Sequence, residues 1–303
     1  TGVAERLGFS YEEAKAINPR IVFCHLTAYG NSGPLALWPG VDQMGQAISG
    51  LEYEQGATAS GGHPTWYRFG MCDAASGLLS VIGVLQALRQ RDRTGQAHSV
   101  EANILTAAMF LSSDAYSVDG EPAERARLDR LQMGFGPLYR LYPTAEGWLC
   151  IAAIHDEHWR PLCSAIGMPE LADDPRFANA RGRKAAADAL STIMEETFSA
   201  KPAAEWFEAL DAKGVPCEIS SETWGAAWFD DPDVVANGWV TDYRHATWGR
   251  LEQPGRFVDF SDSPSRIAGP PPIIGGHTRE VLAELDYDEE LIEKLRAEGV
   301  VAW

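Results

Sequence analysis

The sequence predicts an α/β protein, and three observations lead to this fold class. Helical patterns alternate with short apolar runs along residues 1–116. The run over residues 21–27 lacks regular alternation of apolar and polar side chains, which is typical of a strand buried on both faces of a parallel sheet. In the second half, strand-like runs at 138–142 and 148–154 precede several helical segments, which indicates a further α/β region.

The composition is that of a globular protein with a sizeable core. The chain has 303 residues, enough for one large domain or two modest ones. Its formal charge, 25 − 43 = −18, argues against general affinity for nucleic acid or anionic membranes, although a local basic pocket can still hold an anion. No continuous apolar run approaches the roughly 18–20 residues of a membrane span, so we expect no membrane partner.

The cysteines favour a reducing, cytoplasmic environment. The five are scattered, odd in number and without CxxC spacing. His155 and His158 form the only suggestive histidine pair, and an i, i+3 pair is a weak metal signal because zinc sites need further ligands. We therefore expect neither a disulfide framework nor a metal site.

Local signals place most of the remaining elements. Ser10 followed by Glu13 is a capping-box pattern and predicts a helix that ends at Asn18-Pro19. The loop at 28–34 follows the strand at 21–27, and ligands bind at the carboxyl ends of parallel strands. The other predicted elements are helices at 40–50, 73–91, 102–116, 159–166, 185–198, 203–213, 278–285 and 288–298, strands at 98–101 and 215–219, a surface linker at 121–130, and turns at 230–232 and 252–255.

Asp73 is the most informative single residue. It is the only charged residue between Arg68 and Arg89, and it stands at the start of an apolar helical segment. Aspartate is a favoured N-cap residue, so one interpretation is purely structural. The other is a nucleophilic or general-base carboxylate, kept ionised by the helix dipole, with small neighbours that let a bulky ligand approach. The residues alone leave both interpretations open.

Several familiar catalytic motifs are absent from the sequence. There is no GxSxG segment, so a serine hydrolase has no nucleophile elbow. Gly134 and Gly136 do not belong to a GxGxxG or GxxxxGK[ST] phosphate loop, and neither do Gly61 and Gly62.

Taken in order, a set of short motifs resembles one known family. They are GVAERLG at 2–8, INPRI at 17–21, YGNSGP at 29–34, Asp73 with Gly77, ALRQR at 87–91, TGQ at 94–96, PIIGGHT at 272–278 and VLAEL at 281–285. The chain resembles the class III CoA-transferase family (CaiB/BaiF type), which includes formyl-CoA transferase, carnitine CoA-transferase and α-methylacyl-CoA racemase. The resemblance extends over nearly the whole chain.

The resemblance implies a Rossmann-like large domain and a smaller α/β domain, with the chain crossing to the small domain and returning. The implied parts are 1–115 (large domain), 116–139 (linker and glycine loop), 140–245 (small domain) and 246–303 (linker and return). It also implies an interlocked homodimer with the active site between subunits. Family members begin with a further segment that holds much of the CoA nucleotide site. We therefore expect this chain to be a fragment, one half of a split enzyme that a partner chain completes, or part of a fusion.

The resemblance also implies a mechanism. Asp73 matches the nucleophile that attacks the acyl-CoA thioester and then carries CoA as an aspartyl thioester, before a carboxylic acid accepts it. Coenzyme A is then a co-substrate, and no cofactor is permanently bound. Gly134 and Gly136 resemble the family's mobile glycine loop and would stabilise the oxyanion.

Other implied site residues distinguish branches of the family. Asp42 and Gln46 would line the acyl or acceptor pocket, and Tyr29 and Gly30 would contact CoA. Racemases carry a histidine base where this chain has Val41. The glutamate that partners this histidine aligns with about His155. Valine cannot move a proton, so a transferase is favoured over an acyl-CoA racemase or isomerase. The other alternative is a non-catalytic half of a split or fused enzyme, against which the retained Asp73 counts.

Overall fold

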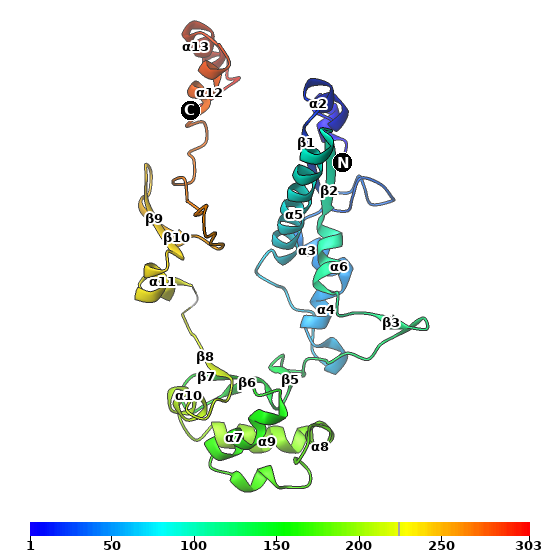
Figure 1. Cartoon of the computed structure of the whole chain (residues 1–303), viewed down its shortest axis with the longest axis vertical. Helices are drawn as coiled ribbons and strands as arrows, with labels where there is room; N and C mark the ends of the chain where they lie inside the picture. The colour runs from blue at the N-terminus through cyan, green and yellow to red at the C-terminus, as the bar shows by residue number, and fades with distance from the viewer. Residues whose placement is uncertain (224) are drawn as a thin grey trace. The chain divides into compact units, whose positions relative to one another are not determined.

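The computed structural model describes residues 1–223 and 225–303 (Figure 1). The chain divides into two compact units, Thr1–Ser220 and Ser221–Trp303. The first unit contains both extensive hydrophobic clusters, and all the residues proposed for the site lie in it. The four-part division implied by the family resemblance stays a prediction.

The N-terminal elements follow the local signals in the sequence. A short helix, α1 (Val3–Arg6), precedes α2 (Tyr11–Ile17), whose capping box between Ser10 and Glu13 is confirmed. Strand β1 (Val22–Thr27) then pairs in parallel with β2 (His98–Asn103). This parallel pair confirms the α/β class, but β1 is not buried on both faces within this chain, because Cys24 and Leu26 are exposed.

Helices pack against this parallel pair and against one another. They are α3 (Asp42–Ser49), α4 (Leu51–Gln55), α5 (Met71–Thr94) and α6 (Ile104–Leu111), with a 3₁₀ turn η1 (Thr58–Ser60) after α4. A small core of Leu51, Cys72, Ile104 and Ala108 joins these helices. Gly45 permits the close approach of α3, since a Cβ there would lie 2.6 Å from Cγ2 of Ile104.

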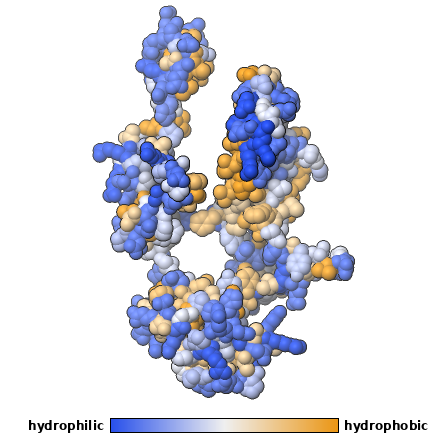
Figure 2. Space-filling model, in the orientation of Figure 1, coloured by the Kyte–Doolittle hydropathy of each residue, from blue (hydrophilic) through white to orange (hydrophobic). Residues whose placement is uncertain are grey.

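Helix α5 runs alongside β1 and β2 and carries an exposed apolar stripe (Figure 1). Leu78, Val81, Ile82 and Leu85 follow the i, i+3, i+4, i+7 spacing of one helical face, and each is more than half exposed. Figure 2 shows apolar surface over this part of the molecule. By length and composition, α5 could cross a membrane, which the sequence analysis did not expect. A single helix of this kind is weak evidence, because core helices of soluble proteins pass the same test.

The second half of this unit is an antiparallel sheet covered by helices. A hairpin of β3 (Ser117–Val118) and β4 (Glu121–Pro122) leads into it. The sheet has the order β5 (Gly134–Gly136), β6 (Tyr139–Pro143), β7 (Trp148–Ala152) and β8 (Cys217–Ser220). The helices are α7 (Asp156–Ala165), α8 (Ala180–Ala185), α9 (Ala187–Phe198) and α10 (Ala203–Asp211), with a 3₁₀ turn η2 (Pro169–Ala172).

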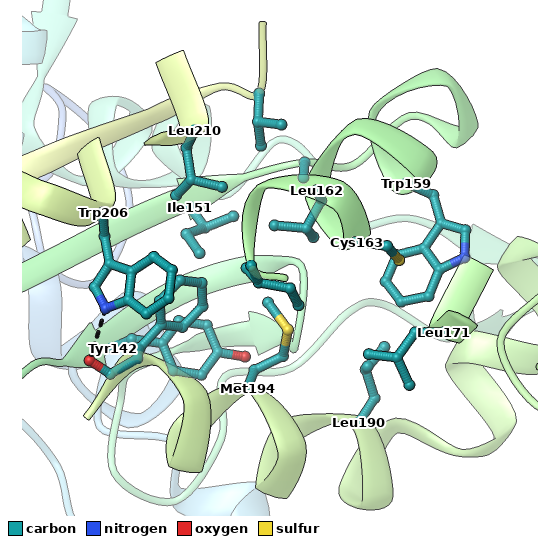
Figure 3. Packing of buried hydrophobic residues seen from close by; sticks show 14 of the residues in the cluster. Tyr142, Ile151, Trp159, Leu162, Cys163, Leu171, Leu190, Met194, Trp206 and Leu210 are labelled. Atoms are coloured by element: carbon teal, nitrogen blue, oxygen red, sulfur yellow. Dashed lines mark hydrogen bonds between the residues drawn. The ribbon is translucent and has the colours of Figure 1, made fainter. Parts of the chain in front are cut away.

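The main hydrophobic core lies between this sheet and its helices (Figure 3). Tyr142 and Ile151 enter it from the sheet, and Leu162 and Met194 enter it from the helices; all four are fully buried. Trp206 closes one side, where its indole N–H donates to the backbone oxygen of Phe198 at 3.0 Å. Burial of so many large side chains makes this core the main stabilising element of the unit.

The unit Ser221–Trp303 departs most from the predicted elements. It contains a 3₁₀ turn η3 (Ala226–Phe229), α11 (Pro232–Ala236), a hairpin of β9 (Val240–His245) and β10 (Gly249–Pro254), α12 (Thr278–Glu284) and α13 (Glu289–Ala297). The predicted turn at 252–255 is wrong, because most of it belongs to β10. Asp231, predicted to lie in a turn, is the N-cap residue of α11, and its side chain accepts the N–H groups of Asp233 and Val234.

A matched pair of glycine substitutions tests the packing of α3. Alanine is favoured over glycine in a helix by about 1 kcal/mol. Nothing lies within 4 Å of a Cβ at Gly77 in α5, so Gly77→Ala should raise the free energy of unfolding by up to that amount. Gly45→Ala should lower it by about 1–2 kcal/mol, because the collision with Ile104 outweighs the gain. Urea denaturation of both variants measures this, and a Gly45→Ala variant as stable as Gly77→Ala would contradict the packing described.

Candidate active site

The first turn of α5 presents Asp73 without using it as a cap. The N-cap residue is Gly70, which offers no side chain, and Asp73 is the third helical residue. The N-cap interpretation of Asp73 is therefore wrong. The backbone N–H of Asp73 instead donates to Oδ2 of Asp42 at 2.8 Å. The cap of α5 thus comes from another helix, while the Asp73 side chain itself is exposed.

Asp42 is held in place by its own helix. It is the first residue of α3 and only 4% exposed. Gln46 lies one turn later, is fully buried, and donates from Nε2 to the other carboxylate oxygen, Oδ1. Both Asp42 oxygens are therefore occupied. The remaining oxygen of Gln46, Oε1, is buried and has no hydrogen-bond partner among the described residues.

The surroundings raise the pKa of both Asp73 and its neighbour Cys72. Partial burial, and then the charge of Asp42, raise the pKa of Asp73 above its ordinary value. Burial, with smaller effects from Asp42 and Asp73, raises the pKa of the Cys72 thiol to about 11. Cys72 is fully buried, so it packs as a small apolar residue. Asp73 is therefore a carboxylate whose charge is less stabilised than in water.

Tyr29 and Gly30 lie in the loop after β1, close to the start of α3. The N–H of Gly30 donates to Oγ1 of Thr27 at 2.9 Å, and its φ of 93° is a conformation that favours glycine. A Cβ at Gly40 would lie 2.8 Å from the Tyr29 ring, so this loop packs directly on the residue before Val41. Val41 is the N-cap residue of α3 and is 60% exposed.

The two predicted loop glycines lie in a strand. Gly134 and Gly136 form β5, paired with Arg140 and Tyr139 of β6. Gly134 is required by packing, since a Cβ there would lie 2.3 Å from the backbone oxygen of Tyr139. Gly136 lines a cavity of about 220 Å³ with Phe135, and the lining does not include Asp73. The expected mobile loop is thus a short edge strand, and the oxyanion role stays a prediction.

His155 is also separate from the carboxylate cluster. It is the N-cap residue of α7, and its ring centroid lies 5.5 Å from that of His158. Within residues 1–223 and 225–303, no hydrogen bond or ion pair joins His155, Gly134 or Gly136 to Asp73. The same part of the chain holds no group of three or more His, Cys, Asp or Glu side chains suited to a metal ion.

The structure therefore brings together Asp42, Gln46 and Asp73, with Tyr29 and Val41 beside them. Gly70 and Cys72 were not predicted from the sequence. No local signal marks Gly70, because Asp73, a favoured N-cap residue, occupies the predicted start of the helix and conceals the true start three residues earlier.

The raised pKa of Cys72 gives a direct test of this local environment. The thiolate is the reactive form, and a pKa of about 11 leaves about one thiol in a thousand ionised at pH 8. With iodoacetamide at pH 8, exposed Cys24 should be alkylated while Cys72 stays unmodified in the native protein. Peptide mass spectrometry measures both, and guanidinium unfolding should make Cys72 reactive. Equal native reactivity would show that the first turn of α5 is open.

Known proteins are similar to this chain in sequence and in fold. Residues 1–278 match the family described as CoA-transferase family III. The chain is 31% identical over 303 residues to succinyl-CoA:glutarate CoA-transferase from Mus musculus, covering 99% of this chain and 68% of that protein. It is 28% identical over 330 residues to formyl-CoA:oxalate CoA-transferase from Streptomyces coelicolor, covering 99% and 76%.

Solved structures agree with the sequence matches. The crystal structure of a CAIB/BAIF family protein from Brucella suis superposes with a TM-score of 0.77 at 27% identity, covering 94% of this chain and 73% of that one. The orthorhombic crystal structure of Rv3272 from Mycobacterium tuberculosis gives 0.76 at 28%, covering 92% and 73%. The mixed α/β fold is thus that of CaiB/BaiF proteins. The chain belongs to the class III CoA-transferase family and is an enzyme of this type.

Proposed function

We propose that the protein is an acyl-CoA:carboxylate CoA-transferase in which Asp73 carries the CoA group during transfer. The observation that carries this proposal is the combination at the start of α5: the backbone of Asp73 is anchored on buried Asp42, while its carboxylate is exposed with a raised pKa. A carboxylate on a fixed backbone, accessible and with its charge less stabilised than in water, suits attack on a thioester.

The proposed reaction passes through two kinds of covalent intermediate on the Asp73 carboxylate. A carboxylate oxygen attacks the thioester carbonyl, the C–S bond breaks, and a mixed anhydride and CoA thiolate form. The thiolate attacks Cγ of Asp73, the C–O bond breaks, the donor acid leaves and an aspartyl-CoA thioester remains. The acceptor carboxylate then attacks this thioester and expels the thiolate, which attacks the new acyl carbonyl and releases ionised Asp73. No proton is consumed.

Relatives guide the proposed substrates. Succinyl-CoA:glutarate, acetyl-CoA:oxalate and formyl-CoA:oxalate transferases are among the similar proteins, so we propose a short carboxylic acid as acceptor and CoA as the carried group. Val41 at the start of α3 supports transfer over racemisation, since an exposed valine offers no second base. Gly134 and Gly136 remain the proposed oxyanion donors, with Tyr29 and Gly30 for CoA.

The assembly is proposed by the same reasoning. An interlocked dimer of a Rossmann-like large domain and a smaller domain, located in the cytoplasm, suits the family. The exposed stripe of Leu78, Val81, Ile82 and Leu85 supports burial of α5 against further protein. All five cysteines are free, which supports a reducing compartment.

Chemical trapping tests the proposed intermediate. Incubation with succinyl-CoA and hydroxylamine should convert Asp73 to a hydroxamate, detectable by peptide mass spectrometry, and Asp73→Ala should abolish both the adduct and transfer to glutarate. Asp92 provides the control, because it lies exposed on the same helix at the opposite end. Asp92→Asn should leave the adduct and the transfer rate unchanged. An Asp73→Ala variant with wild-type transfer would refute the proposal.

The raised pKa of Asp73 predicts a pH dependence of aspartyl-CoA formation. Only the ionised carboxylate attacks, so the rate of this step, measured without hydroxylamine, should rise with pH and level off above the raised pKa. The midpoint should lie above the ordinary aspartate value of about 3.9. Acid quenching and intact-protein mass spectrometry across an acidic pH series, limited to the range where circular dichroism shows a folded protein, measure it. A midpoint below the ordinary value would contradict the described environment.

A further inference from the structure

We propose that Asp42 is a positioning residue, which aims the Asp73 carboxylate by accepting the Asp73 backbone N–H. The inference rests on the proposed function of Asp73. It replaces a role for Asp42 in contacting substrate with one exerted through the backbone of the nucleophile.

The need for such a residue follows from the start of α5. The first N–H groups of a helix lack partners within the helix, and the side chain of the N-cap residue ordinarily accepts the one at the second or third position. Gly70 has no side chain, and Asp73 is at the third position. Oδ2 of Asp42, at 2.8 Å, therefore takes the place of the missing cap oxygen.

The acceptor is itself fixed, which a positioning role requires. Asp42 is almost fully buried, and Gln46 holds its other oxygen from the next turn of the same helix. Gly45 lies on α3 between these two residues, and there the helix packs on Ile104 and Cys72. A buried acceptor with both oxygens occupied has one available orientation, so the first turn of α5 inherits the position of α3.

A substrate contact is the weaker interpretation of Asp42. Its side chain is 4% exposed, whereas Asp73 and Val41 on either side of it are exposed. Both oxygens of Asp42 already accept hydrogen bonds from the chain. A ligand would have to displace Gln46 or the Asp73 backbone to reach them.

The substitution Asp42→Asn removes the negative charge at this position but keeps an oxygen that can accept a hydrogen bond. The asparagine amide oxygen can still accept the Asp73 N–H. The NH₂ group of the new side chain would face Gln46. Oε1 of Gln46, which is buried without a partner in the wild-type protein, would accept a hydrogen bond from this NH₂ group once the Gln46 amide rotates by half a turn. Asp42→Asn therefore keeps the anchor, and Asp42→Ala removes it.

The experiment compares these two variants in transfer from succinyl-CoA to glutarate. Asp42→Ala should lower kcat by about 100-fold, the order of loss expected for a displacement of 1 Å, with KM for succinyl-CoA within about threefold of wild type. Asp42→Asn should stay within about fivefold in kcat. It should also move the acidic limb of the pH profile to lower pH, because the Asp42 charge raises the pKa of Asp73.

Hydrogen exchange supplies a readout that does not depend on activity. The Asp73 amide should exchange faster in Asp42→Ala than in wild type and Asp42→Asn. Gln46→Met, which frees one Asp42 oxygen but keeps the side-chain volume, should lower kcat by about 3–10-fold at unchanged KM. This variant keeps the test decisive if Asp42→Ala does not fold.

Specific results would overturn the inference. Equal loss of kcat in Asp42→Ala and Asp42→Asn would assign the effect to charge, and a rise in KM alone would assign it to substrate contact. An unchanged kcat in Gln46→Met would also contradict the positioning role. Asp73→Ala with full activity would instead refute the proposed function, whatever the Asp42 variants show.

Discussion

The hydrogen bond between the Asp73 backbone and the Asp42 carboxylate joins two helices whose relative position decides where the exposed carboxylate lies. Gly70 leaves the first turn of α5 without a local cap, so the acceptor comes from α3. Gln46 fixes that acceptor, and the close approach of Gly45 to Ile104 keeps α3 against α5 and α6. The position of the proposed nucleophile is thus determined by packing between elements rather than by the sequence around Asp73.

The buried pair of Asp42 and Gln46 lowers the stability of the folded protein. A buried carboxylate loses hydration, and here an amide and a helix N–H group replace it, while Oε1 of Gln46 gains no partner in exchange. An apolar pair of similar size would fill the same space without that penalty. A costly polar pair beside a carboxylate of raised pKa is typical of functional sites. In the proposed reaction, the Asp42 charge makes ionised Asp73 less stable and so favours the neutral acylated form.

What the sequence predicted was chiefly local. The Ser10–Glu13 capping box and the parallel α/β class needed only near neighbours or a short apolar run. The β9–β10 hairpin was not predicted, because no Asn-Gly or Asp-Gly pair marks its turn. Instead, Nδ1 of His245 stabilises the turn by accepting the N–H groups of Thr247 and Trp248. Asp73 was found as a candidate, but its relation to Asp42 spans two helices, and no short pattern encodes it.

The proposed nucleophile, at the start of a long helix, meets two opposed requirements. Attack on a thioester needs an accessible side chain, while precise aim needs a backbone that does not move. Asp73 is exposed, yet its N–H is anchored on Asp42, and α5 continues along β1, β2 and α6. Cys72, the residue before it, is fully buried and holds the same turn from the opposite side. Alternating burial within one helical turn therefore gives a rigid backbone and a free carboxylate at adjacent positions.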